Sequence, residues 1–143
     1  MRDSANGTFA TLAVALWLLL LVTALGALGR TDALEALVTA AALGRWAAIV
    51  HGVATPAARK EGLGAGFAPG PWSLAFATLL AIVVALACKG IVDGAVAVAV
   101  AAVVAAITSA WSRRALGGRT GDTLGATITL TEAAIVVTLL ALV

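Results

Sequence analysis

The sequence has few of the residues on which soluble proteins and their sites depend. Its 143 residues include no tyrosine, one cysteine, one histidine and three prolines, and only 16 side chains carry a formal charge, nine basic and seven acidic. That is 11% of the chain, against roughly 25% in an ordinary soluble domain. One cysteine and one histidine exclude a disulfide framework and a Cys/His zinc site built within one chain. A net charge of only +2 excludes a basic surface of the kind that binds nucleic acid.

Hydrophobic residues instead make up 62% of the chain, and the mean hydropathy is +1.10. A soluble globule of this length cannot hide so much apolar surface, because much of any small folded chain stays in contact with water. A helix that spans the bilayer needs about 20 mostly apolar residues. The sequence therefore predicts an all-α, polytopic integral-membrane helix bundle, with residues 1–143 forming a single domain in the lipid bilayer.

The charged residues divide the chain into apolar segments, each of which is a predicted transmembrane helix. The first segment is interpreted as a retained span, because its uncharged run exceeds the roughly 7–15-residue apolar core of a signal peptide. Asp32 is expected to cap the second span through its side-chain oxygen. Polar connections are predicted at 55–71, which is rich in glycine and proline, and at 112–125. The five predicted spans are 8–28, 34–53, 72–88, 95–111 and 126–143.

The basic residues are unequally divided between the two sides of such a bundle. Five spans place only Arg30 and Lys89 on one side. The other side receives Arg2, Arg59, Lys60, Arg113, Arg114 and Arg119. Short loops rich in Lys and Arg stay in the cytoplasm. The sequence thus predicts a multi-pass protein of the cell inner membrane, with the N-terminus and the longer polar connections cytoplasmic.

Two charged residues fall inside predicted spans. Arg45 lies near the middle of the second span, and Glu132 lies about two turns inside the last one. A charge at this depth costs a few kcal/mol, so it usually faces a cavity or a partner. Either Arg45 orients a substrate, with Glu132 also in a catalytic role, or the two residues only pair with each other as a structural contact. The single histidine, His51, is expected to be an interfacial side chain rather than a ligand.

The connection at 55–71 combines cations with glycines. Arg59 and Lys60 precede Gly62 and Gly64, and glycines let backbone N–H groups approach an anion closely. This chemistry suits a phosphate, although the segment is neither a Walker A loop nor a GxGxxG turn. The alternative is an ordinary solvated loop at the membrane surface.

The connection at 112–125 carries the stronger pattern. It contains Arg119, Thr120, Gly121 and Asp122 in a glycine-rich loop. A carboxylate in this setting can hold a divalent cation, while the arginine and the threonine orient a phosphate. The structural alternative is a capping loop in which Asp122 or Thr123 is the N-cap of the last span.

Three segments, taken in order, resemble one family. The opening M-R-D-S-A-N-G resembles an internal M-[KR]-D-S-x-x-G segment of that family, and G-R-T-G-D-T-L-G-A at 118–126, followed by Glu132, resembles its G-x-T-G-D-x-x-G-A segment. Between them, G-R-W-A at 44–47 and the residues from Pro56 to Phe67 resemble its middle. The family is that of cobalamin synthase, the adenosylcobinamide-GDP ribazoletransferases, and the resemblance covers essentially the whole chain.

This resemblance implies a membrane transferase that joins α-ribazole, or its 5′-phosphate, to adenosylcobinamide-GDP with release of GMP and with the help of Mg²⁺. It implies that Asp122 lies near the metal, that Arg59, Lys60 and Arg119 contact phosphates, and that Arg2, Asp3 and Ser4 line the same cytoplasmic mouth. Family members also carry an N-terminal acidic D-G-x-A-D-x-x-D-G segment that this sequence lacks. The chain is therefore expected to correspond to the C-terminal portion of a synthase, with a second chain as a possible source of the acidic segment. The competing hypothesis is a non-enzymatic membrane transporter or assembly subunit that uses Arg45 and Glu132 as a buried pair.

Overall fold

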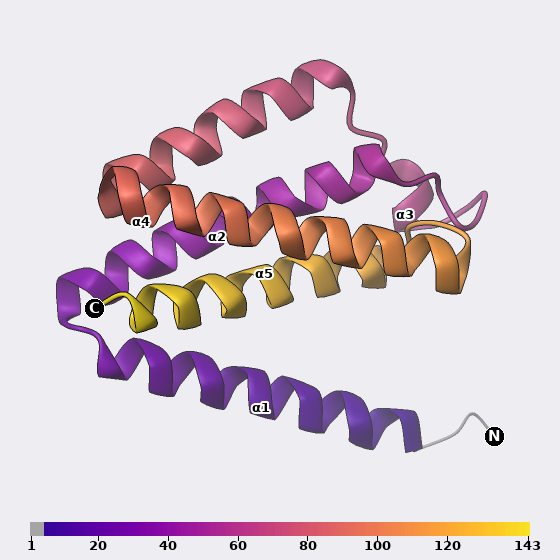
Figure 1. Ribbon diagram of the computed structural model, residues 1–143. Helices are drawn as coiled ribbons and strands as arrows, with labels where there is room; N and C mark the ends of the chain where they lie inside the picture. The colour runs from indigo at the N-terminus through magenta and orange to yellow at the C-terminus, as the bar shows by residue number, and fades with distance from the viewer. Residues whose placement is uncertain (1–4) are drawn as a thin grey trace.

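The computed structural model describes residues 5–143, which form an all-helical bundle (Figure 1). Four helices are long and apolar enough to cross a membrane, and a single-turn helix lies in one connection. The predicted Arg2, Asp3 and Ser4 lie outside the described residues. The helices are α1 (Ala5–Ala27), α2 (Arg30–Ala54), α3 (Leu63–Gly66), α4 (Pro71–Leu116) and α5 (Gly121–Ala141).

Helix α4 is a hairpin of two helical arms. The backbone at Gly90 leaves the helical region, with φ 73° and ψ −176°, and Figure 1 shows α4 doubling back at its left-hand end. In a straight helix, Ala85 and Gly94 would be separated by about 13.5 Å, because they are nine residues apart. Here a Cβ on Gly94 would lie only 2.8 Å from the carbonyl oxygen of Ala85, so the two arms are in contact. The two arms correspond to the third and fourth predicted spans, which makes five spanning segments in all.

We expect Gly90→Ala to destabilise the bundle by about 1–3 kcal/mol, because the backbone conformation at this position is open almost only to glycine. The measurement is the free energy of unfolding in mixed detergent micelles. The control is Gly26→Ala, since Gly26 lies in α1 with nothing near its Cβ position. Equal stability of the two variants would contradict a conformational requirement at the turn.

The core forms where α2 packs against α4 and α5. Much of it is alanine, which lets helices approach closely in a membrane. Helix α1 is peripheral: its side chains at 7–16 are all exposed, and the Trp17 indole donates to the Thr129 carbonyl of α5 at 3.1 Å. The fully buried core residues include Ala36, Leu43, Ala85, Ala97, Ala101, Ala105, Ile135 and Val136.

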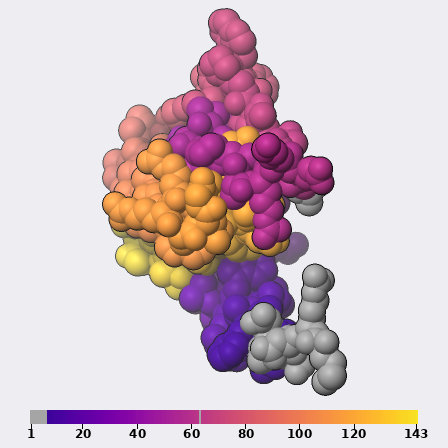
Figure 2. Space-filling view, turned by 90° about the vertical axis from the view of Figure 1, so that its right-hand side faces the viewer, coloured from indigo at the N-terminus to yellow at the C-terminus, as the bar shows by residue number. Residues whose placement is uncertain are grey.

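Contacts between segments far apart in the sequence define the two ends of the bundle. At one end Ala57 pairs with Arg119 in an isolated β-bridge; at the other end Lys89 binds Asp32 at 3.4 Å and Glu35 at 3.2 Å. The connections at 55–70 and 117–120 therefore share an end. Figure 2 views this end directly and shows the 55–66 region (magenta) against the end of α4 (orange), with α1 (indigo) to one side.

Two predicted helix starts are wrong. Helix α2 begins at Arg30 after Gly29, with no side-chain cap, and Asp32 binds Lys89 instead of capping the helix. Helix α5 begins at Gly121, five residues before the predicted span at 126. The second polar connection thus shrinks to residues 117–120, because both flanking helices extend into the segment that was predicted to be a loop.

Candidate functional site

The site is built where the two polar connections meet. The Arg119 amide donates to the Pro56 carbonyl at 2.8 Å, and the Ala58 amide donates to the Arg119 carbonyl at 3.0 Å. Gly64 lies directly on this junction, since a Cβ there would sit 2.7 Å from the Thr120 Cα. Only a residue without a side chain permits this approach. The first connection is thereby held against the N-terminal end of α5.

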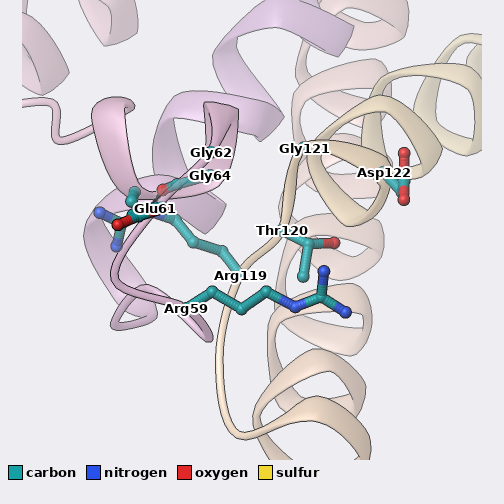
Figure 3. Close-up of a pocket in the computed structure, with 9 residues that line it drawn as sticks. Arg59, Glu61, Gly62, Gly64, Arg119, Thr120, Gly121 and Asp122 are labelled. Carbon is teal, nitrogen blue, oxygen red and sulfur yellow. Dashed lines mark hydrogen bonds between the residues drawn. The ribbon is translucent and has the colours of Figure 1, made fainter.

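A pocket of about 230 Å³ lies between the two connections (Figure 3). Seven of its lining residues are ones that the sequence pattern selected, and they come from both connections. Glu61 and Ala65 line the pocket as well and were not predicted. The seven predicted residues are Arg59, Gly62, Gly64, Arg119, Thr120, Gly121 and Asp122.

The Arg119 side chain is buried and ties the connections together. Its Nε donates to the Gly64 carbonyl at 3.0 Å, and its Nη1 donates to the carbonyls of Gly52, at 3.0 Å, and Thr55. Three of the five guanidinium hydrogens are thus committed to backbone carbonyls, which leaves the two on Nη2. Figure 3 shows Arg119 pointing back into the first connection, away from Asp122. The geometry gives Arg119 a structural task that the sequence pattern did not indicate.

Thr120, and neither Asp122 nor Thr123, is the N-cap of α5. The Thr120 hydroxyl accepts from the Thr123 amide at 3.2 Å, and the Thr123 hydroxyl accepts from the Thr120 amide at 2.9 Å, which is a reciprocal capping box. The predicted cap at Asp122 or Thr123 is therefore wrong. Asp122 stays exposed in the first turn, without a hydrogen bond to any described residue.

The free charges of the pocket are Arg59, Glu61 and Asp122. Figure 3 shows the Arg59 side chain extending past Thr120, and its guanidinium makes no hydrogen bond within residues 5–143. Lys60 is exposed beside it but does not line the pocket. A cation and the N-terminal end of α5, which is the positive end of its helix dipole, face the same space, an arrangement that suits an anion.

Arg45 and Glu132 form an ion pair between α2 and α5, which was one of the two alternatives for these mid-span charges, but the Arg45 side chain is exposed rather than buried. Neither residue lines the pocket. Glu132 lies ten residues beyond Asp122 on α5, or about 15 Å along the helix. The structure thus separates Arg45 and Glu132, for which a catalytic role was predicted, from Asp122, which was predicted to act catalytically near the metal.

Comparison with known proteins places the chain in a family. Its residues 1–140 match the family described as Cobalamin-5-phosphate synthase. The chain belongs to this family. Among curated proteins it is 39% identical over 142 residues to the adenosylcobinamide-GDP ribazoletransferase of Roseiflexus sp. (strain RS-1), with 97% of this chain and 52% of the relative covered. It is 43% identical over 145 residues to the protein of the same name from Alkalilimnicola ehrlichii, with 99% of this chain and 56% of the relative covered.

The chain spans about half the length of these synthase-family relatives. The matched region includes both connections, the pocket and the Arg45–Glu132 pair. No solved structure matches the chain.

The described residues offer few metal ligands. No cluster of three or more His, Cys, Asp or Glu side chains that could hold a metal occurs within residues 5–143. Glu61 and Asp122 are the two carboxylates of the pocket. Figure 3 shows their side chains on opposite sides of the pocket. Mg²⁺ is commonly bound by one or two carboxylates together with substrate phosphates and water, so a single carboxylate such as Asp122 fits a site that the substrate would complete.

A polar layer inside the bundle was not predicted from the sequence. His51, expected at the interface, is completely buried, with its Nδ1 2.7 Å from the Thr127 hydroxyl, which in turn donates to Thr108 at 3.0 Å. The repeat of Thr123, Thr127 and Thr131 at intervals of four puts three hydroxyls on one buried face of α5. That spacing was the available signal for the layer.

Proposed function

We propose that the chain provides the phosphate-binding part of an adenosylcobinamide-GDP ribazoletransferase. In this reaction a hydroxyl of α-ribazole, or of its 5′-phosphate, forms a bond to the phosphorus next to cobinamide. The bond from that phosphorus to GMP breaks, so that adenosylcobalamin, or its 5′-phosphate, and GMP are the products. The observation that carries the proposal is the convergence of Arg59, Asp122 and the N-terminal end of α5 on one pocket, in a chain of this family.

The pocket residues suit a pyrophosphate. The Arg59 guanidinium has no partner within residues 5–143 and is available to pair with a phosphate oxygen. The amides of Gly121 and Asp122, at the start of α5, are among those that a helix leaves without internal partners. Arg119 fixes the wall of the pocket by donating a hydrogen bond to the Gly64 carbonyl. Donors fixed in advance around the phosphates stabilise the charge that develops during transfer.

We further propose that Asp122 holds Mg²⁺ at the phosphates. When bound, the ion would neutralise charge on the leaving GMP. Because the relatives extend over about twice the matched length, we propose that the complete site includes acidic residues outside these 143, on a further segment or on a second chain. The small number of carboxylates supports this proposal, since the described pocket has only Glu61 and Asp122.

The proposed location is the cell inner membrane, with the pocket facing the cytoplasm, where nucleotides are found. Five basic residues lie at or beside the pocket end of the bundle, and the opposite end has Arg30 and Lys89. An excess of Lys and Arg marks the cytoplasmic side of a membrane protein. The residues at the pocket end are Arg59, Lys60, Arg113, Arg114 and Arg119.

Arg59→Ala is expected to lower ribazole transfer by about tenfold to a hundredfold, mainly through a higher KM for adenosylcobinamide-GDP, because a charge-assisted phosphate contact is lost. The assay uses the chain in proteoliposomes, together with the part of the Roseiflexus relative that it does not match, and follows release of GMP. The control is Arg114→Ala, which removes the same charge at the same end but outside the pocket lining.

Equal transfer by the two variants would contradict the phosphate role of the pocket. An absence of transfer with every variant and with the unchanged chain would overturn the proposed activity. The competing transporter or assembly-subunit hypothesis predicts that Arg45 and Glu132 are required while residues 119–125 tolerate substitution.

A further inference from the structure

A second hollow, of about 410 Å³, opens within the membrane-spanning part of the bundle. It lies between α2 and the first arm of α4, and we call it the lateral groove. Its lining includes the aromatic side chains of Trp46 and Phe76 and the aliphatic side chains of Ile49 and Leu80, together with Arg45. The proposed phosphate chemistry makes no use of this groove.

Arg45 brings hydrogen-bond donors into these apolar surroundings. Its Nη1 donates to the Ala41 carbonyl at 3.3 Å and to Glu132, but Nε and Nη2 have no partner among residues 5–143. The side chain is 62% exposed at a depth where lipid chains offer no acceptors. Such unsatisfied donors are costly in a membrane, so an occupant that supplies an acceptor is favoured over an acyl chain. Because Glu132 already balances the charge, that occupant is neutral.

The wall of the groove is aromatic, and Trp46 is held in place. The Trp46 indole donates to the Thr78 hydroxyl at 2.9 Å, and that hydroxyl donates to the Leu74 carbonyl at 2.7 Å. This chain of hydrogen bonds fixes the ring between α2 and α4. A fixed aromatic ring favours a flat aromatic partner, and a guanidinium adds attraction to the face of such a ring.

We propose that the lateral groove binds the benzimidazole base of α-ribazole. The inference rests on the proposed function, because the base is the flat, neutral part of that substrate and keeps one free ring nitrogen as an acceptor. Ile49, which lines the groove, lies three residues before Gly52, or about 4.5 Å along α2. The Gly52 carbonyl accepts from Arg119, so the groove runs toward the end of the bundle that carries the phosphate pocket.

The test is equilibrium dialysis of α-ribazole, and separately of free benzimidazole, against the chain in lipid nanodiscs, with empty nanodiscs as the blank. Ala77→Leu adds bulk inside the groove and is expected to weaken binding of both probes by about tenfold or more. Ala75→Leu is the matched control, because Ala75 is exposed on the same arm outside the groove lining. Arg45→Lys keeps a positive charge opposite Glu132 but removes the forked donors, and we expect it to weaken binding as well.

Equal affinity of the Ala77→Leu and Ala75→Leu variants, or binding no greater than to empty nanodiscs, would overturn the proposal. Asp122→Asn separates the two hypotheses, since it is expected to stop transfer while leaving base binding intact. Binding that depends on Ala77, in a protein that never releases GMP, would refute the transferase and leave the groove as a site for aromatic bases. Transfer with a KM for α-ribazole that is unchanged by Ala77→Leu would refute the groove and leave the transferase.

Discussion

Asp122→Asn is expected to lower ribazole transfer by about a hundredfold or more, because the substitution removes the carboxylate that is proposed to hold the metal at the phosphates. Asn has nearly the same shape, and Asp122 makes no hydrogen bond within the described chain. The loss of a negative charge at the start of α5 costs only about 0.3–1 kcal/mol of stability. The measurement is GMP release in proteoliposomes, with helix content followed by circular dichroism.

Asp93→Asn provides the control for this experiment. Asp93 lies just after the turn of the α4 hairpin, at the opposite end of the bundle from the pocket. Transfer should be unchanged in this variant. If Asp122→Asn releases GMP as fast as Asp93→Asn does, Asp122 holds neither the metal nor a catalytic position.

Arg119→Leu is expected to destabilise the bundle by about 3 kcal/mol, because three buried carbonyls lose their hydrogen-bond donor. Each unsatisfied carbonyl costs roughly 1–3 kcal/mol, and water that hydrates the carbonyls in the variant keeps the total near the lower limit. The carbonyls belong to Gly52, Thr55 and Gly64, so the 55–66 segment should detach from α5. Two measurements apply: the free energy of unfolding in mixed micelles, and the rate of proteolysis within 55–66.

The matched substitution is Arg113→Leu. Arg113 is exposed at the same end and donates only to the Ala54 carbonyl, at 3.5 Å, so its loss should change stability by less than about 0.5 kcal/mol. If both leucine variants unfold at the same denaturant concentration, Arg119 does not tie the two connections together. A stable Arg119→Leu protein with greatly reduced transfer would assign Arg119 to phosphate binding instead.

Hydropathy predicted the spanning segments, because each is a run of apolar residues set off by charges. The same spans predicted which polar segments share an end, since the number of crossings fixes the side of each connection. The order of the spans therefore places Arg59 and Asp122 at one mouth of the bundle, and both residues line the pocket. The prediction needed only topology, which is largely encoded by the local sequence.

Features that depend on the packing of distant residues were not predictable in this way. The Arg119 side chain holds carbonyls that lie 55 to 67 residues away in the sequence. No local sequence pattern indicates that these carbonyls lie near Arg119 in the fold. The early start of α5 depends on a hydroxyl pair, Thr120 and Thr123, that outweighs the preference of the following glycines for a loop. The complete burial of His51 likewise requires its partner Thr127 on another helix.

The tight turn at Gly90 also bears on how the protein enters the bilayer. Because one residue reverses the chain, no loop separates the two arms of α4, and we expect them to insert as one helical hairpin. In the proposed orientation, the tip of that hairpin carries Lys89 and Asp93 across the membrane together. Their formal charges cancel, so the hairpin is translocated with no net charge at its tip. On arrival, Lys89 meets the carboxylates of Asp32 and Glu35 at the start of α2, which anchor the tip on the far side.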